Sequence, residues 1–370
     1  MRRPSKMEYN VVFAALTLFL SSGCMHNSEP STADRSAAVA AQAQDSTWTV
    51  GRRRLPAPAG TSDSLREAIA SSPQPDTAEY IQATTFTTPE QWAPMISAVN
   101  AGREQRVEVL AERWSVTIKE SEIAGVTVRT VTPDTVDPAN TSRLFVHTHG
   151  GAYVTGRGIG GADEAVQIAH YAGISVISID YRMPPEHPFP AAVDDVVAVW
   201  RSLLSERSAK SMALGGTSAG GGLAMASIHR FMELGLETPG VLWAGTPWAD
   251  LTKTGDSHFT NEGIDRVLVS YHGLLESAAK LYADGRDLRM PLISPVYGDF
   301  DGFPPTYLVT GTRDLFLSDV IRVHRKMRIA GVVADLNVYE GISHGEYTLD
   351  SPEMDQVFGE LGEFLLRHLQ

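Results

Sequence analysis

Short apolar runs alternate with longer amphipathic stretches along most of this chain from residue 144 onward. The runs are rich in Val, Ile and Leu, as in strands buried on both faces, and the longer stretches repeat apolar residues at helical spacing. This alternation predicts an α/β fold with a mostly parallel sheet covered by helices on both faces. We expect strands at 144–146, 174–179, 212–214, 241–244, 306–310 and 334–339, and helices at 162–171, 191–204, 221–234, 320–330 and 354–369.

Two regions depart from this alternation. The sequence before it predicts helices at 62–70 and 89–112, followed by segments 114–118 and 126–131, which alternate as an antiparallel strand pair does. Segment 256–290 interrupts the alternation. We expect it to be an inserted helical piece over the sheet edge where the strands end, because right-handed crossovers place the loops that follow parallel strands on one edge.

The N-terminus has the layout of an export signal. Basic residues precede a short apolar run at 11–20, which is too short to span a bilayer, and small residues at 21–23 lead to Cys24. This order resembles the lipobox of bacterial lipoproteins, whose cysteine is lipidated and becomes the new N-terminus; the alternative is a plain secretory signal. We expect residues 1–23 to be a signal peptide, Cys24 to anchor an exported cell-envelope protein, and residues 24–60 to form a flexible tether.

Composition narrows the class of protein. The chain has 370 residues, 43% of them hydrophobic and 20% charged, which suits a soluble globular body with a large core. The formal net charge of −13 repels phosphate backbones, so we expect no nucleic-acid partner. A single cysteine excludes an intramolecular disulfide and a cysteine-based metal site.

The pentapeptide Gly216-Thr217-Ser218-Ala219-Gly220 stands between a predicted strand and a predicted helix. A strand, then Gly-x-Ser-x-Gly, then a helix is the setting of a nucleophile elbow. Glycines flank the serine because the turn leaves no room for larger side chains. The strained turn raises the hydroxyl out of the sheet, where a substrate carbonyl can reach it. We therefore expect Ser218 to be a catalytic nucleophile.

A serine nucleophile needs a base to take its proton and a carboxylate to orient that base. His344 stands in a glycine-flanked loop after one predicted strand, and Asp314 directly follows another. Both loops belong to the sheet edge that carries Ser218, so the three side chains are expected to converge. Asp319 is the alternative carboxylate, although it also suits the N-cap of the following helix.

The run His149-Gly150-Gly151-Ala152 follows the strand predicted at 144–146. Glycines there let backbone amides approach a substrate oxygen closely. We expect the oxyanion hole to be formed by amides near Gly150, Gly151 and Ala152, together with the amide of Ala219 directly after the nucleophile. For His149 we expect a role in ordering the loop through hydrogen bonds, because no cluster of ligands at metal-binding spacing accompanies it.

These motifs occur in the order and rough spacing of a known family. The His149–Gly151 run, the segment 180–190 (Asp-Tyr-Arg-Met-Pro-Pro-Glu-His-Pro-Phe-Pro), the pentapeptide 216–220, Asp314 and His344 resemble hormone-sensitive-lipase-like (family IV) bacterial carboxylesterases of the α/β-hydrolase fold. Segment 311–319 resembles a subgroup that contains lactone hydrolases and acetyl esterases.

The resemblance implies a domain organisation. It assigns residues 114–370 to a catalytic α/β-hydrolase domain, and residues 61–113 together with the insertion at 256–290 to a helical cap. Phe86, Trp92 and Met95 are then candidates for lining the acyl pocket, with packing between cap and core as the alternative.

The implied activity is hydrolysis of short-chain esters through Ser218, Asp314 and His344 and an acyl-enzyme, without a metal or organic cofactor. The partner is a small-molecule ester or lactone. The alternatives are a lactone hydrolase, an amidase or an acyltransferase with the same triad, and a surface binding module that keeps the fold without catalysis. An intact triad argues against the last of these.

Overall fold

The computed structural model describes residues 49–51 and 54–370. The predicted signal peptide, Cys24 and most of the predicted tether lie outside these residues. The fold below is that of residues 56–370, which form one unit. In the described part of the chain, none of the helices is both long enough and apolar enough to cross a membrane.

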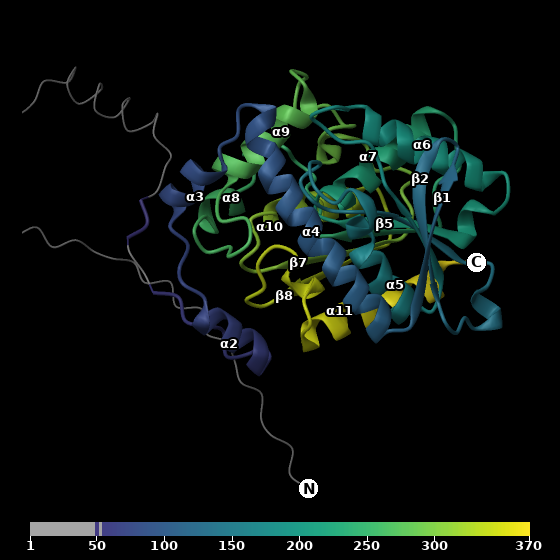
Figure 1. Ribbon diagram of the computed structural model, residues 1–370, viewed down its shortest axis with the longest axis horizontal. Helices are drawn as coiled ribbons and strands as arrows, with labels where there is room; N and C mark the ends of the chain where they lie inside the picture. Colours follow the sequence, from purple (N-terminus) through teal and green to yellow (C-terminus); the bar gives the residue numbers. More distant parts are fainter. Residues whose placement is uncertain (1–48, 52–53) are drawn as a thin grey trace, which may run out of the picture. The chain divides into compact units, whose positions relative to one another are not determined.

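An eight-stranded sheet forms the centre of this unit, in the order β1-β2-β4-β3-β5-β6-β7-β8 (Figure 1). The β1–β2 and β2–β4 pairs are antiparallel and all other neighbours are parallel. Both the mostly parallel sheet and the antiparallel pair predicted from the sequence are therefore confirmed. The strands are β1 (Val116–Ile123), β2 (Val126–Pro133), β3 (Leu144–Thr148), β4 (Ser175–Ile179), β5 (Met212–Thr217), β6 (Val241–Gly245), β7 (Thr306–Gly311) and β8 (Ala334–Tyr339).

Helices cover both faces of the sheet (Figure 1). Neighbouring residues of β3 illustrate the two layers: Phe145 is buried in the apolar cluster beneath α5 and α11, whereas Val146 is buried in the cluster beneath α6 and α7. Successive side chains of a strand point to opposite faces, so a central strand covered on both sides is apolar throughout. The covering helices are α5 (Asp163–Ala172) and α11 (Pro352–His368) on one face, and α6 (Ala191–Leu204), α7 (Ala219–Glu233) and α10 (Leu317–Ile329) on the other.

The N-terminal helices of residues 61–113 and the insertion at 256–290 are distant in the sequence but contact each other, and we refer to them together as the cap. Gly273 of the insertion packs against α3 so closely that a Cβ there would lie 2.3 Å from Thr84 Oγ1. The amide of Phe86 donates a 3.2 Å hydrogen bond to Ser277 Oγ at the start of α9. The N-terminal helices and the insertion thus contact each other directly. The cap helices are α2 (Asp63–Ser71), α3 (Thr77–Thr84), α4 (Pro89–Arg113), α8 (Ser257–Thr260) and α9 (Glu276–Ala283).

Two differences from the predicted elements have a physical cause. Helix α3 was not predicted, because its eight residues have no buried member and so leave no clear apolar pattern in the sequence. Strand β5 was predicted to end at Leu214 but continues to Thr217 through two glycines. A Cβ at Gly216 would lie 1.8 Å from Thr148 O, so close approach of β3 requires glycine where strand propensity disfavours it.

Candidate active site

Ser218 occupies the turn between the end of β5 and the start of α7. Its backbone has φ 64° and ψ −126°, a conformation that is strained for a residue with a side chain. The Ser218 amide donates a 2.8 Å hydrogen bond to Gly245 O, which ties the turn to β6. A Cβ at Gly220 would lie 1.9 Å from Thr148 O, so the glycine after the turn is as necessary as the one before it. The turn has the geometry of a nucleophile elbow.

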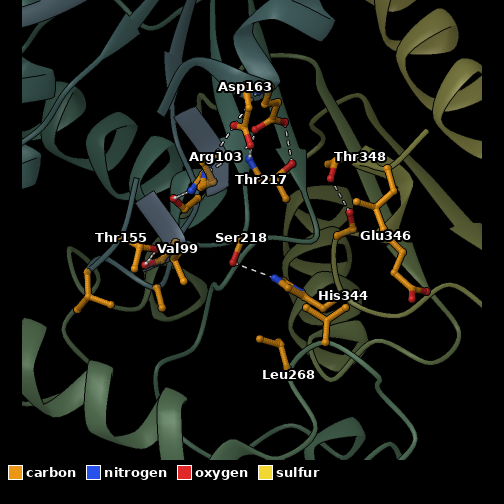
Figure 2. A pocket seen from close by; sticks show the side chains of 18 of the residues that line it. Val99, Arg103, Thr155, Asp163, Thr217, Ser218, Leu268, His344, Glu346 and Thr348 are labelled. Carbon is orange, nitrogen blue, oxygen red and sulfur yellow. Dashed lines mark hydrogen bonds and ion pairs between the residues drawn. The ribbon is translucent and has the colours of Figure 1, made fainter. Parts of the chain in front are cut away.

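The structure brings Ser218, His344 and Asp314 together. His344 Nε2 lies 2.9 Å from Ser218 Oγ (Figure 2). On the other side of the ring, His344 Nδ1 lies 3.2 Å from Asp314 Oδ1. The histidine and the aspartate come from the loops after β8 and β7, which end at the same edge of the sheet as β5. This is the hydrogen-bonded order of a nucleophile, a base and an orienting carboxylate.

Several donors hold the Asp314 carboxylate in place. Oδ1 accepts a 2.8 Å hydrogen bond from the amide of Phe316. Oδ2 accepts one from Thr310 Oγ1 at 3.2 Å and another from Thr246 Oγ1. The carboxylate is fully buried, so these contacts restrict it to the orientation that faces His344.

Asp319, the alternative carboxylate, has other partners. Its Oδ1 lies 3.6 Å from His258 Nε2, and its Oδ2 accepts a 3.2 Å hydrogen bond from the amide of Asp250. Burial raises the pKa of Asp319 to about 6, although His258 acts in the opposite direction. Asp319 is not the N-cap residue that its position in the sequence also allowed, because α10 begins at Leu317 and the aspartate lies in its first turn.

A third buried carboxylate, Asp265, was missed at the sequence level. It belongs to the insertion, and its side chain is fully buried. It accepts hydrogen bonds from the amides of Leu315 (2.9 Å) and Val267 (2.8 Å), and so ties the cap to the residue after Asp314. Burial, followed by repulsion from Asp314, raises the pKa of Asp265 to about 6.

The charges around His344 determine how readily it is protonated. Burial lowers the pKa of the imidazole, but the carboxylates of Asp314 and Asp265 favour the charged ring. The carboxylates outweigh burial, so the pKa of His344 lies above its ordinary value. A base with this environment accepts the serine proton and stabilises the resulting imidazolium.

The predicted oxyanion-hole residues lie beside the nucleophile. Gly150, Gly151 and Ala152 line the same cavity as Ser218. Gly151 has φ 124° and Ala152 has φ 54°, so the loop bends through left-handed conformations at the cavity wall. Within the described residues, the amides of these three residues and of Ala219 donate no hydrogen bond to another protein group. They remain available to an oxygen atom in the cavity.

His149 lies behind this loop instead of facing the cavity. Its ring stacks on Tyr181 with the centroids 4.1 Å apart, and Nδ1 lies 2.9 Å from Gly150 O. Burial, followed by the nearby charge of Arg103, lowers the pKa of His149 to about 3, so the ring is neutral. Because a carbonyl only accepts, Nδ1 carries the proton and donates to Gly150 O. These contacts agree with the loop-ordering role expected for His149.

Glu164 is a buried residue that the sequence analysis did not identify. Its carboxylate accepts hydrogen bonds from Thr217 N (3.0 Å), Thr217 Oγ1 (2.7 Å) and Trp243 Nε1 (2.8 Å). It also lies 3.1 Å from His147 Nε2. One side chain of α5 thereby holds both β3 and the residue before Ser218. An acidic residue on the sheet-facing side of an otherwise apolar helix was the available signal.

A cavity of about 400 Å³ opens over Ser218. Met95 lines it as expected, whereas Phe86 and Trp92 pack on each other with ring centroids 4.7 Å apart and line a separate hollow beside α9. Most of the cavity wall is apolar. The apolar lining residues from the cap are Met95, Val99, Val267, Leu268, Leu274 and Leu275.

The described residues contain no cluster of three or more His, Cys, Asp or Glu side chains arranged to hold a metal ion.

Residues 145–348 match the family model described as alpha/beta hydrolase fold. The chain belongs to the α/β-hydrolase fold family. The fold of this α/β hydrolase is close to that of a solved structure, esterase E25, with a TM-score of 0.85 and 48% identity over 88% of this chain and 100% of the other. A solved esterase from the bacterial hormone-sensitive lipase family has a TM-score of 0.70 and 29% identity, over 84% and 100% of the two chains.

A curated relative is also similar in sequence. An acetyl-hydrolase of Streptomyces hygroscopicus is 34% identical over 59% of this chain and 73% of its own length. The resemblance to hormone-sensitive-lipase-like esterases that was based on separated motifs is confirmed, and this α/β hydrolase is an enzyme of that family.

Proposed function

We propose that the protein is a serine carboxylic-ester hydrolase that acts on short-chain acyl esters. The observation that carries this proposal is the hydrogen-bonded series Ser218 Oγ, His344 and Asp314, with contacts of 2.9 Å and 3.2 Å. The series lies at a cavity whose wall has backbone amides without an acceptor among the described residues. A hydroxyl alone is a poor nucleophile, and this arrangement supplies the base that activates it and the group that orients the base.

The geometry supports acyl transfer to the serine. His344 Nε2 takes the proton as Ser218 Oγ attacks the ester carbonyl, and Asp314 stabilises the imidazolium that forms. The amides of Gly151, Ala152 and Ala219 are the candidates for binding the oxygen of the tetrahedral intermediate. His344 then protonates the leaving alcohol. Water attacks the acyl-enzyme by the same route, and Ser218 is regenerated.

Size and lining of the cavity favour a short acyl chain. About 400 Å³ has to accommodate both sides of the scissile bond, and the insertion that covers it is anchored to the core by Asp265 and to α3 by the packing at Gly273. Figure 2 shows Leu268 of the insertion and Val99 of α4 facing the space around Ser218. Relatives named acetyl-hydrolase and esterase support the same class of substrate.

The test combines one variant with a substrate series. Ser218→Ala should lower turnover of p-nitrophenyl acetate by on the order of 10⁴-fold, because loss of a triad member has that effect in comparable sites. A fluorophosphonate probe should label the wild-type protein once and leave the variant unlabelled. Ser227→Ala is the matched control, since Ser227 lies on α7, the helix that directly follows Ser218, and its buried hydroxyl has no hydrogen-bond partner among the described residues.

Specificity constants across p-nitrophenyl esters from acetyl to palmitoyl, with a lactone and an anilide alongside, test the substrate class. We expect a maximum at short chains. A maximum at twelve or more carbons, or stronger activity on the lactone or the anilide, contradicts the proposed substrate. Near wild-type turnover by Ser218→Ala contradicts the proposed mechanism.

A further inference from the structure

We propose that Arg103 of the cap helix α4 is a positioning residue of the oxyanion hole, which holds and polarises the peptide unit that joins Gly150 to Gly151. The inference rests on the proposed function, because it assigns a role within that reaction. Arg103 does not touch the reacting atoms; it acts through the backbone of the loop that follows β3.

Arg103 divides its donors between two partners. Nη2 lies 2.8 Å from Asp163 Oδ1 and Nε lies 3.3 Å from Asp163 Oδ2, at the start of α5. This fork leaves Nη1, which donates a 2.9 Å hydrogen bond to Gly150 O. The Arg103 side chain is only 19% exposed and that of Asp163 13%, so the pair is shielded from solvent. Figure 2 shows Arg103 and Asp163 pointing toward one another beside Ser218.

The geometry of the peptide unit links the hydrogen bond at Gly150 O to the direction of the Gly151 N–H. The peptide unit is planar and trans, so the N–H of Gly151 points away from the C=O of Gly150. The carbonyl faces Arg103 and His149 Nδ1, which both donate to it at 2.9 Å. The opposite N–H has no acceptor among the described protein groups. It is therefore held toward the cavity by hydrogen bonds made at the other end of the same peptide.

The charge of Arg103 strengthens the hydrogen bond that the Gly151 N–H can donate, in addition to fixing the direction of that N–H. Hydrogen bonds from an ionised donor are roughly twice as strong as neutral ones, and linked hydrogen bonds polarise one another in a buried site. Withdrawal of electrons at Gly150 O makes the Gly151 N–H a better donor. The benefit is largest when full negative charge develops on the substrate oxygen, which happens in the transition state and not in the bound ester.

Close packing sets the position of the guanidinium relative to the loop. A Cβ at Gly160 would lie 3.1 Å from Arg103 Cβ and 3.2 Å from Asn100 O, so glycine allows α4 to approach the loop. One turn earlier on α4, Asn100 Oδ1 accepts a 2.7 Å hydrogen bond from Gly156 N. The helix of the cap and the loop after β3 thus form one rigid contact with Arg103 at its centre.

The alternative is that Arg103 only ties α4 to α5 through Asp163. The two roles differ in what they predict. If Arg103 only links α4 to α5, its loss lowers the free energy of unfolding and disturbs the whole cavity, so substrate binding weakens. Loss of oxyanion-hole positioning lowers transition-state stabilisation while ground-state binding is kept.

The experiment compares Arg103→Met with Asp163→Asn. The second change removes the charge partner of Arg103 but keeps Arg103 itself as the donor to Gly150 O. For Arg103→Met on p-nitrophenyl acetate we expect kcat to fall roughly 10- to 100-fold and KM to stay within about twofold. The inhibition constant of a trifluoromethyl ketone, which binds as a tetrahedral oxyanion, should rise by the same factor as kcat/KM falls. Asp163→Asn should lose much less kcat. Arg113→Met is the matched control on the same helix, since Arg113 pairs with exposed Asp350.

Two results would overturn the inference: equal losses of kcat in Arg103→Met and Asp163→Asn, or a raised KM with an unchanged inhibition constant. Arg103 would then serve only to link α4 to α5 through Asp163. If Arg103→Met does not fold, Arg103→Gln is measured in the same way and judged by the same outcomes. If the wild-type protein hydrolyses esters and Ser218→Ala does not, the proposed function stands whether or not the inference about Arg103 holds. A wild-type protein that neither hydrolyses esters nor reacts with a fluorophosphonate removes both proposals.

Discussion

At the scale of single residues, the two carboxylates that follow β7 show how environment separates chemically identical groups. Asp314 and Asp319 are both fully buried and five positions apart. Only Asp314 faces the imidazole of His344, whereas Asp319 faces His258 and the backbone of Asp250. The first arrangement orients a base, and the second supports the packing of α10 against the loop after β6.

This difference predicts unequal effects of the same substitution. Asp314→Asn should lower kcat by on the order of 10⁴-fold, because an asparagine no longer favours the productive tautomer of the histidine. Asp319→Asn should retain most of the turnover and instead lower the melting temperature, because it changes a fully buried polar contact. Steady-state kinetics and thermal melts of both variants provide the measurement. If Asp319→Asn proves the more damaging change to kcat, the assignment of the carboxylate is wrong.

The protonation of His344 predicts the pH dependence of the reaction. The base must be neutral to take the serine proton, so activity rises with pH through the pKa of His344. Burial lowers that pKa, but Asp314 and Asp265 raise it by more, so it lies above the ordinary value of 6.5. We expect the acid limb of kcat/KM to have its midpoint above about 6.5. In Asp314→Asn the midpoint should move to lower pH. A wild-type midpoint below pH 6 would show that burial outweighs the carboxylates.

At the scale of elements, the turn from β5 to α7 depends on glycines that let three backbone segments meet. A Cβ at Gly216 would lie 1.8 Å from Thr148 O and one at Gly220 would lie 1.9 Å from the same oxygen. Real Cβ atoms do not approach this closely, so the turn cannot form unchanged with alanine at either position. The elbow is therefore a contact between β3 and the β5–α7 unit and not merely a local turn.

Gly216→Ala should consequently displace Ser218 from its position beside His344. We expect a loss of stability of about 3 kcal/mol or more from overpacking, and a fall in turnover of on the order of 100-fold or more from misplacement of the nucleophile. Thermal melts and kinetics on one preparation measure both effects.

Gly359→Ala is the control for this substitution. Gly359 lies within α11, and a Cβ there would meet nothing within 4 Å. Alanine should therefore stabilise the helix by about 0.5–1 kcal/mol and leave kinetics unchanged. Wild-type stability and activity in Gly216→Ala would contradict the close approach on which this argument depends.

At the scale of the whole molecule, the cap joins chain segments that are far apart in sequence over one catalytic edge. Asp265 from the insertion contacts the amide next to Asp314, and Arg103 from α4 contacts the carbonyl of Gly150. The insertion therefore contacts the loop that carries Asp314, and helix α4 contacts the loop that carries the oxyanion-hole amides. Changes in the cap are expected to alter catalysis as well as substrate size.

The N-terminal residues outside the described range motivate a prediction about location. We propose that the protein is exported and anchored through acyl chains on Cys24, because the basic, apolar and small-residue order of the first 24 positions resembles a lipoprotein signal. Cys24→Ser should move the enzyme from the membrane fraction to the soluble fraction with esterase activity retained. Mass spectrometry of the mature N-terminus accompanies the fractionation. Unchanged fractionation, or a mature protein that does not begin at Cys24, contradicts the anchor and leaves the hydrolase assignment untouched.

The sequence by itself determined the fold and the order of the candidate triad. Alternating apolar runs and amphipathic stretches specify a parallel sheet, and parallel strands end at one edge. Residues in the loops that follow β5, β7 and β8 therefore meet, which is why the motifs and loop positions of Ser218, Asp314 and His344 predicted that their side chains converge.

Only the tertiary structure decided which residues support these three. Arg103, Glu164 and Asp265 act on partners 47 to 53 positions away, through side chains whose own neighbours in sequence carry no catalytic motif. Their contacts arise because α4, α5 and the insertion pack against the catalytic edge. A pattern of apolar and polar positions indicates which face of an element is buried, but it does not indicate which distant atom that face will meet.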